Sequence, residues 1–463
     1  MKRPLWRILA ALFALTLVAG ACAGDDDDDT SAGDESGDES GDSGDSGGSG
    51  DVEIETVDVF PLPPVGDSGE VVLTGGTFAG AFSADQDTMA VLEFMASPEY
   101  VERRLEAEVG GFLSANQNVD LEAYSGFEQT LVEILQNAEA ARFDGSDDMV
   151  AEVGAGTFWT AATDIVSGNA TVEEAFAEVE SGYPEVPEVA ECPAPEIGPG
   201  DGTVTIFGPE VEQEQQGFQQ SFDAFTEETG IAVEVQGDRS AEEQIGVQVQ
   251  GGNPPDIFIF PQPGLLRSFV ADCQLVPLPE NVVSAMEANF VEGFIAGGKV
   301  GDQYYGVPNK SDVKSLVWYS PDAFEAKGYE VPADHDEFTA LMDEMVENGD
   351  TPLCVGIGSD AATGWPFTDW IEDYMLRLHG VDVYDQWVNH EIPFDDPKVV
   401  EVGEFVMDIW EKEGYVFGGT QAAASTPFAE SGLGILEGDC MLHRQANFYA
   451  ANWPEGITVG SES

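Results

Sequence analysis

The chain has 463 residues, of which 89 are Asp or Glu and 16 are Lys or Arg, so its formal net charge is −73 at pH 7. Such a surface repels nucleic acid and anionic lipid headgroups, which excludes nucleic acid as a partner. The length allows two large lobes or three small domains, plus a tail. A hydrated acidic surface that stays soluble in salty surroundings explains the charge; the alternative is a role in binding a basic partner.

Residues 1–21 have the composition of an export signal. Basic residues precede an apolar stretch, residues 8–18, which is too short to span a bilayer stably. Small residues then lead to Cys22, a pattern that resembles a bacterial lipobox, although Ala19 stands where Leu is usual. We therefore expect Cys22 to be lipidated and to anchor the protein to the cell membrane on its extracytoplasmic face. The alternative is an ordinary cleavage site with a bystander cysteine.

Residues 22–51 consist almost entirely of Asp, Glu, Ser and Gly after the first few positions. Such a segment has no apolar surface to bury, so we expect a disordered acidic tether. The globular part starts at residue 52. A Pro-rich stretch without periodicity, residues 185–200, is predicted to be a linker between two folded segments, 52–184 and 201–463.

Apolar periodicity predicts helices and strands in both segments. Residues at helical spacing predict helices around 89–95, 131–135, 218–225, 341–345 and 402–410. End signals are Gly230 for the third helix, Asp334 or Asp336 for the fourth, and Gly414 for the fifth. Short β-type runs cover 203–207, 231–235 and 257–260. This alternation predicts an α/β protein with a mostly parallel sheet.

Four cysteines remain beyond Cys22, and an exported location permits disulfides. Four thiols allow three pairings, of which we favour Cys354 with Cys440 and Cys192 with Cys273. Free buried thiols are the alternative. The spacing does not suggest zinc, and no metal site is predicted.

Four stretches carry a family resemblance: residues 251–269, 304–332, 354–373 and 438–448. Together they resemble the extracellular solute-binding proteins of family 1, the maltose-binding-protein-like receptors of carbohydrate ABC importers, and most closely the α-glucoside type. The resemblance implies a type II periplasmic-binding-protein-like fold, with two discontinuous α/β lobes joined by a hinge. It also implies a monomer that traps a di- or oligosaccharide by domain closure and docks on the transmembrane subunits of an ABC permease. Neither catalysis nor a cofactor is implied.

The order of the family-like stretches is unusual. Segment 52–184 resembles the family's C-terminal third, and segment 201–463 resembles its N-terminal two thirds. We therefore expect a circular permutation in which the linker joins the family's usual ends. The alternative is a rearrangement that leaves two fragments unable to fold together.

A sugar site needs aromatic rings for C–H faces and paired polar groups for hydroxyls. The resemblance implies cleft aromatics at Trp159, Phe260, Trp365 and Phe448, each of which could instead be structural. Polar candidates are Glu210, Gln262, Asp312, Asp360, Arg444 and Asp144, the last in a loop with Arg142 and Asp147. Lys310 could pair with Asp312, and Arg444 could simply fix the hinge. Maltose-type relatives carry an acid and a Lys after the first strand, where this chain has Glu210 alone, so maltodextrin is in doubt as the ligand.

Two other functions stay open from the sequence. An exported glycoside hydrolase needs two carboxylates at a set separation, and with 89 acids such pairs arise by chance. A surface sugar sensor would share the fold without an importer. Zinc hydrolysis is disfavoured because the four His are scattered and no H-E-x-x-H motif occurs.

Overall fold

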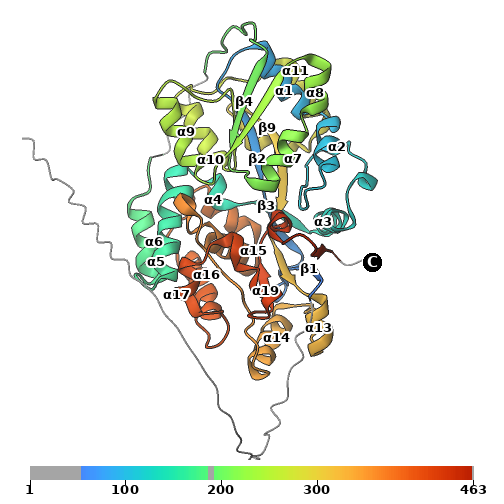
Figure 1. Cartoon of the computed structure of the whole chain (residues 1–463). Coiled ribbons are helices and arrows are strands. Elements are labelled where there is room, and N and C mark those ends of the chain that lie inside the picture. The colour runs from blue at the N-terminus through green and yellow to red at the C-terminus, as the bar shows by residue number, and fades with distance from the viewer. Residues whose placement is uncertain (1–53, 186–191, 461–463) are drawn as a thin grey trace, which may run out of the picture. The chain divides into compact units, whose positions relative to one another are not determined.

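The computed structural model describes residues 54–185 and 192–460, and every structural statement below concerns these residues (Figure 1). The predicted export signal, Cys22, the acidic tether and part of the linker lie outside them. Within the described residues, no helix has the length and apolar character that crossing a membrane requires.

The larger sheet has the strand order β3-β2-β6-β4-β5, with β9 also paired to β2. Strands β4 and β5 are parallel, as are β4 and β6, whereas β2 runs antiparallel to β6 and β9. The sheet is therefore mixed. Three of its five strand pairings are parallel, β2 with β3 among them, and both antiparallel pairings involve β2, which enters the sheet from the N-terminal segment against the direction of β6. The strand bounds are β2 Val71–Ala81, β3 Ala140–Phe143, β4 Thr203–Gly208, β5 Ala232–Gly237, β6 Ile257–Phe260 and β9 Gly306–Val313.

A smaller sheet has the order β11-β10-β1-β12. Strand β1 runs antiparallel to β10 and parallel to β12. The N-terminal segment thus contributes β1 to one sheet and β2 and β3 to the other, so both segments flanking the linker build both sheets. The bounds are β1 Thr56–Pro61, β10 Leu316–Tyr319, β11 Leu442–Arg444 and β12 Thr458–Val459; a separate hairpin joins β7 Lys299–Val300 to β8 Gln303–Tyr304.

Strands β2 and β9 form the longest ladder of the described chain, from Thr74 opposite Val313 to Gly80 opposite Gly306 (Figure 1). Strand β3 pairs with the start of β2, and β6 pairs with its end. The carboxyl ends of β3 and β6 therefore approach the middle of β2, at 75–77, from opposite directions. Loops leaving these strands must converge over this point.

The helices agree with the sequence periodicity, with two differences: one predicted helix is divided in two, and another ends before its predicted end signal. The predicted helix around 218–225 is divided into α7 and α8, and Gly230, at φ 80°, ends α8. Asp334 caps α14 through a hydrogen bond from the Glu337 amide. Helix α16 ends at Trp410, and Gly414 lies in the turn beyond it rather than at its end.

The helix bounds are α1 Gln86–Met95, α2 Pro98–Glu106, α3 Gly126–Asn137, α4 Gly145–Asp148, α5 Trp159–Val166, α6 Val172–Ser181, α7 Glu212–Gln220, α8 Asp223–Thr229, α9 Ala241–Gln250, α10 Pro263–Ala271, α11 Glu280–Asn289, α12 Glu292–Ile295, α13 Pro321–Lys327, α14 His335–Glu347, α15 Trp365–Val388, α16 Pro397–Trp410, α17 Gly419–Ser425, α18 Phe428–Ser431 and α19 Gly434–Glu437. A π-helical stretch, Val153–Phe158, precedes α5, and a 3₁₀ stretch, Asn447–Asn452, follows β11.

Apolar side chains gather in two large cores. One core packs α5, α6, α14, α15 and α16 together with Phe60 and Leu73 from β1 and β2. The other packs α1, α2, α7, α8 and α11 against β4 and β6, and a smaller cluster lies under α9 and α10. Each fully buried Leu or Phe contributes about 1.5–3 kcal/mol. The predicted α/β class and two discontinuous lobes are confirmed, because each large core draws on both segments.

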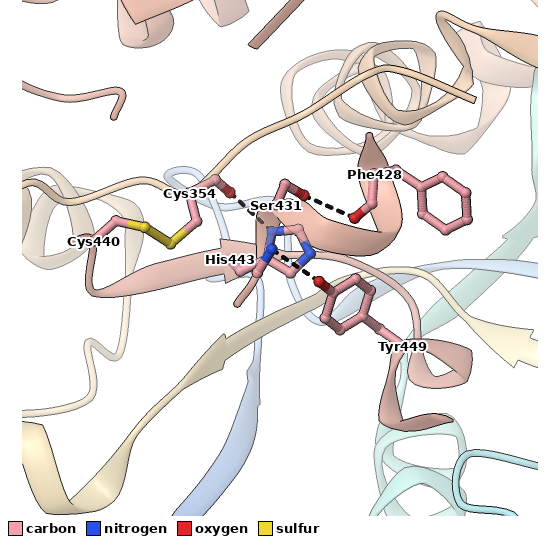
Figure 2. Close-up of a disulfide and its surroundings, with 7 residues drawn as sticks. Cys354, Phe428, Ser431, Cys440, His443 and Tyr449 are labelled. Carbon is pink, nitrogen blue, oxygen red and sulfur yellow. Dashed lines mark hydrogen bonds between the residues drawn. A yellow bond between two sulfur atoms is a disulfide. The ribbon is translucent and has the colours of Figure 1, made fainter. Parts of the chain in front are cut away.

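Both predicted cysteine pairs are joined as disulfides. Cys192 bonds Cys273 just beyond α10, with their Cα atoms 5.4 Å apart. Cys354 bonds Cys440 ahead of β11, with a Cα separation of 5.5 Å. Figure 2 shows His443 beside the second disulfide, where its Nδ1 lies 2.8 Å from the Cys354 carbonyl oxygen. This disulfide therefore fixes the start of the strand that carries Arg444.

Candidate functional site

A cavity of about 140 Å³ lies over the middle of β2, where loops of both lobes meet. Its floor includes Gly76 and Thr77 of β2. Glu210, Arg239 and Gln262 reach it directly after the parallel strands β4, β5 and β6. Asp144 reaches it after β3, from the other lobe. Side chains at the carboxyl ends of strands meet in this way wherever an open α/β sheet binds a ligand.

Aromatic rings form the wall of the cavity on the side of the lobe whose core packs α5 and α15. Trp159 begins α5, Trp365 begins α15 and Phe428 begins α18. The Trp365 ring centroid lies 4.9 Å from that of Phe428 and 6.0 Å from that of Phe448. Trp159 is 5% exposed, so most of its ring is packed against the protein.

Strand β9 contributes three alternate residues to the lining, Lys310, Asp312 and, just beyond its end, Lys314. Since successive side chains of a strand point to opposite faces, residues two apart share one face. The two lysines organise separate groups of charges. We call these the Lys310 cluster and the Lys314 cluster.

The Lys310 cluster comprises Arg104, Glu210, Glu214, Arg239, Lys310 and Asp312. Lys310 Nζ lies 3.2 Å from Glu214 Oε1, and Arg239 Nη2 lies 3.9 Å from the other oxygen of that carboxylate. Lys310 therefore contacts Glu214, whereas the sequence suggested Asp312 as its partner. Lys310 also lies 5.3 Å from the Phe448 ring centroid.

Burial has the largest effect on the pKa values of the two acids of this cluster that face the cavity, Glu210 and Asp312. It raises the pKa of Glu210 above its ordinary value, although the positive charges of Arg104 and Lys310 act against it. It raises the pKa of Asp312 in the same way, against Lys310 and Lys314. For Glu214 burial also acts upward, but Lys310 and Arg239 outweigh it and the pKa is lowered. Glu214 is thus the carboxylate whose charged form the neighbouring cations favour most.

The Lys314 cluster comprises Asp144, Asp147, Lys314, Asp369, Glu372, Asp373, Arg377 and Arg444. Lys314 Nζ bonds Asp144 and lies 3.2 Å from Asp369 Oδ1. Arg444 bonds the other oxygen of Asp369 at 3.2 Å and Asp373 at 2.6 Å. The stem of Lys314 passes over Gly75, where a Cβ atom would lie 2.8 Å from Lys314 Cε, so a larger residue there would push the lysine aside.

Arg377 extends this cluster to the N-terminal segment. Its Nη1 bonds Asp373 at 2.5 Å, while its Nη2 donates to the backbone carbonyl of Leu62 at 2.7 Å. Two further carbonyls, of Pro63 and Val71, accept from the same guanidinium. The cluster thus links α15, β11 and the connection between β1 and β2.

The carboxyls of the Lys314 cluster divide into ionised and neutral members. Burial alone would raise the pKa of Asp144, but the charge of Lys314 and hydrogen bonds lower it well below its ordinary value. Burial and the neighbouring Asp144 charge raise the pKa of Asp369 to about 7, against Lys314 and Arg444. Oxygens of Asp144, Asp369 and Glu372 lie within 4.8 Å of one another, as metal ligands would. Lys314 already supplies a cation to two of the three, so we assign no metal to them.

Four buried polar atoms at the cavity have no hydrogen-bond partner within the described protein. They are the donor Trp159 Nε1 and the acceptors Glu210 Oε2, Gln262 Oε1 and Asp312 Oδ1. An unsatisfied buried polar group costs about 1–3 kcal/mol, so such groups call for an external partner. These atoms define what a ligand must offer.

The structure brings seven of the predicted site residues together at this cavity: Trp159, Gln262, Trp365, Phe448, Glu210, Asp312 and Asp144. Three others lie elsewhere. Phe260 is fully buried in the core with its ring centroid 4.7 Å from that of Phe258. Asp360 is exposed in a short 3₁₀ turn, with φ 46°. Arg444 lies behind the cavity wall, within the Lys314 cluster.

Several lining residues were not predicted, among them Arg239, Lys314 and Phe428. The strand-end position that identified Glu210 and Gln262 also applies to Arg239 after β5. Strand alternation from Lys310 and Asp312 leads to Lys314. No sequence signal marks Phe428, which reaches the cavity through the tertiary placement of α18. The predicted loop member Arg142 points away and pairs with Asp385 at 2.6 Å.

Comparison with known proteins finds a family match in the central part of the chain. Residues 208–435 match the model of the bacterial extracellular solute-binding proteins. The alpha-glucosides-binding periplasmic protein AglE of Rhizobium meliloti is 40% identical over 270 residues, which cover 56% of this chain and 59% of AglE. The osmoprotective compounds-binding protein GgtB of Synechocystis is 41% identical over 261 residues, which cover 55% of this chain and 61% of GgtB.

The aligned part thus spans about three fifths of the length of these relatives. Among solved structures, the bacterial solute receptor AcbH is 23% identical, with a TM-score of 0.43 over 56% of this chain and 67% of its own.

Proposed function

We propose that this protein is an extracytoplasmic receptor that binds a sugar in the cavity over β2 and delivers it to an ABC importer, without chemical change. One observation carries the proposal: a buried donor and three buried acceptors without partners in the described chain open beside four aromatic rings. Aromatic faces suit the C–H faces of a sugar ring, and free polar atoms suit its hydroxyls.

The relatives support this ligand class. AglE is named for binding α-glucosides and GgtB for binding osmoprotective compounds, and a Pyrococcus horikoshii relative, 26% identical over 156 residues, is named as an ABC transporter extracellular-binding protein. We therefore propose an α-glucoside-like di- or oligosaccharide as ligand and an ABC permease as partner. Lipid anchoring through Cys22 and a monomeric receptor belong to the same proposal.

The mechanism that we propose is closure of the two lobes on the ligand. The cavity takes Glu210 and Gln262 from one lobe and Trp159 and Trp365 from the other, so a bound sugar would bridge them. The β2–β9 ladder runs between the lobes directly beneath the cavity, where it would serve as the hinge. Closure follows if the ligand has higher affinity for the closed arrangement than for the open one.

We also propose that the chain is a circular permutation of the family pattern. In support, β1 and β2 of the N-terminal segment pair with β10 and β9 of the other segment, and β1 lies beside β12. A chain rebuilt in the order 201–463 then 52–184 should bind the same ligand with similar stability. A rebuilt chain that does not fold, while the natural order does, would overturn this part of the proposal.

Binding and hydrolysis are separated by one combined experiment. Calorimetry and thermal unfolding are measured against a panel of mono- and disaccharides with α and β linkages, followed by chromatography of each sugar after incubation. A true ligand at a concentration of 100 Kd should raise the unfolding free energy by about 2.7 kcal/mol and be recovered intact. No stabilisation by any sugar, or recovery of cleaved products, would contradict the proposal.

A further inference from the structure

The charge pattern of the cavity bears on which sugars can enter. Six carboxyl side chains line it against three basic ones: Asp144, Asp147, Glu210, Glu214, Glu242 and Asp312 against Arg239, Lys310 and Lys314. Numbers alone do not decide the ligand charge, since an uncommitted lysine could still bind an anion. The contacts of each basic group decide it.

Each basic group of the lining is already engaged. Lys310 is held by Glu214 at 3.2 Å and lies over the Phe448 ring. Lys314 bonds Asp144, Asp147 and Asp369, three acceptors for the three hydrogens of its ammonium. Arg239 lies 3.9 Å from Glu214 and 5.6 Å from the centroid of the Phe428 ring. Any ligand anion that approached one of them would therefore also approach the carboxylate beside it.

The unengaged atoms have the opposite polarity. Among the fully buried polar atoms of the described lining, three acceptors, on Glu210, Gln262 and Asp312, have no partner, against a single donor, on Trp159. All four side chains are at most 5% exposed, so water cannot readily satisfy them. A ligand for this cavity must bring several donors, as sugar hydroxyls do. A carboxylate or phosphate brings acceptors only and would face carboxyl oxygens in a buried site.

We infer that the cavity selects uncharged, hydroxyl-rich sugars and rejects their carboxylated or phosphorylated counterparts, with Glu210 and Asp312 as the excluding groups. This inference rests on the proposed function, since it concerns the same cavity. It goes further because it assigns a charge rule to the site and names the residues that enforce it.

The test compares ligands that differ in a single group. Methyl α-glucoside and methyl α-galactoside are titrated at pH 8 by calorimetry beside the matching glycosiduronates, in which C6 is a carboxylate. Each neutral member that binds should do so at least 100-fold more tightly than its acidic partner. Asp312→Asn should narrow that ratio at least tenfold, because it removes one buried negative charge and adds a donor.

A matched control separates the cavity from the charge of the whole protein. Glu401→Gln removes one exposed acid, 68% exposed and absent from the cavity lining, and should leave the ratio unchanged. Repeating the titrations in 1 M salt should also leave the ratio of the two affinities unchanged, since screening acts mainly on exposed charges.

The outcomes are distinguishable. If neither neutral sugar binds and no sugar of the wider panel does, the proposed function fails. If acidic and neutral members bind alike, or if salt abolishes the difference, the charge rule is overturned while sugar binding stands.

Discussion

The Lys310 and Lys314 clusters are built around lysines four residues apart in the chain, yet they are completed differently. In the Lys314 cluster every buried carboxyl finds a partner within the described protein: Glu372, for example, accepts from the amides of Gly145 and Ser146 at 2.7 and 3.1 Å. In the Lys310 cluster Glu210 and Asp312 each keep one oxygen without a partner. Both clusters are buried, so exposure does not explain the difference.

The difference teaches how to separate a binding group from a structural one. A cluster whose carboxyls all find partners within the chain joins parts of that chain, as the Lys314 cluster joins α15, β11 and the β1–β2 connection. A cluster that leaves atoms unsatisfied in a cavity requires a ligand to complete it. Removal of a group should therefore reduce stability in the first cluster and affinity in the second.

Lys314→Met gives the largest expected loss of stability. It removes the cation shared by Asp144 and Asp369 and leaves buried carboxyls without compensation, which costs about 3–5 kcal/mol. Denaturant unfolding measures the change. The control is Lys412→Met, whose exposed pair with Asp343 at 2.6 Å should contribute less than about 1 kcal/mol. Equal losses of unfolding free energy in the two variants would contradict a structural role for the Lys314 cluster.

The strand that carries Arg444 gives a pH-dependent test. Burial lowers the pKa of His443 to about 4, with the Cys354 carbonyl acting against it (Figure 2). The unfolded chain binds a proton near pH 6.5 and the folded chain does not until about pH 4, so stability falls as pH decreases across this window. The loss should approach about 3 kcal/mol at pH 4, since each pH unit between the two pKa values is worth about 1.4 kcal/mol.

His443→Gln isolates this contribution. Both proteins share the buried Asp369, whose pKa of about 7 stabilises the folded state at low pH and so acts in the opposite direction. The difference between wild type and variant, from unfolding measured at pH 4 to 7, should therefore report the histidine alone. Parallel stability curves for the two proteins would show that His443 does not titrate as its burial requires.

The sequence predicted more of the fold than of the site. Helical faces such as that of α16 and the apolar strand β6 carry their period in local order, so they were visible without coordinates. The pairing of β2 with β6 and β9 joins residues 176 to 239 positions apart and has no local signal, which is why its antiparallel direction was not expected.

The site shows the same limit at the level of single residues. Glu210 and Gln262 were named through the family resemblance, and both follow strands directly, which is a local property. Phe260 was also predicted from its place at the end of β6, but it is the last residue of the strand and its side chain lies on the core face. Whether a polar atom is satisfied depends on neighbours from distant segments, so no sequence pattern could distinguish Asp312 from Asp373.

Two tryptophans provide the smallest and sharpest test. Trp318 Nε1 donates to the Gln445 carbonyl at 2.9 Å, whereas Trp159 Nε1 has no partner in the described protein. Trp318→Phe should lose about 0.5–1.5 kcal/mol of stability through that bond. Trp159→Phe removes no such bond, so it should lower the stability of the ligand-free protein less than Trp318→Phe does, but it should weaken sugar binding up to about tenfold, as expected for one lost hydrogen bond to the ligand. Unfolding and calorimetry on both variants check the pair. If Trp159→Phe lowers stability without weakening sugar binding, the Trp159 indole N–H has a structural role. It is then not the buried donor that the described cavity lining offers to a ligand.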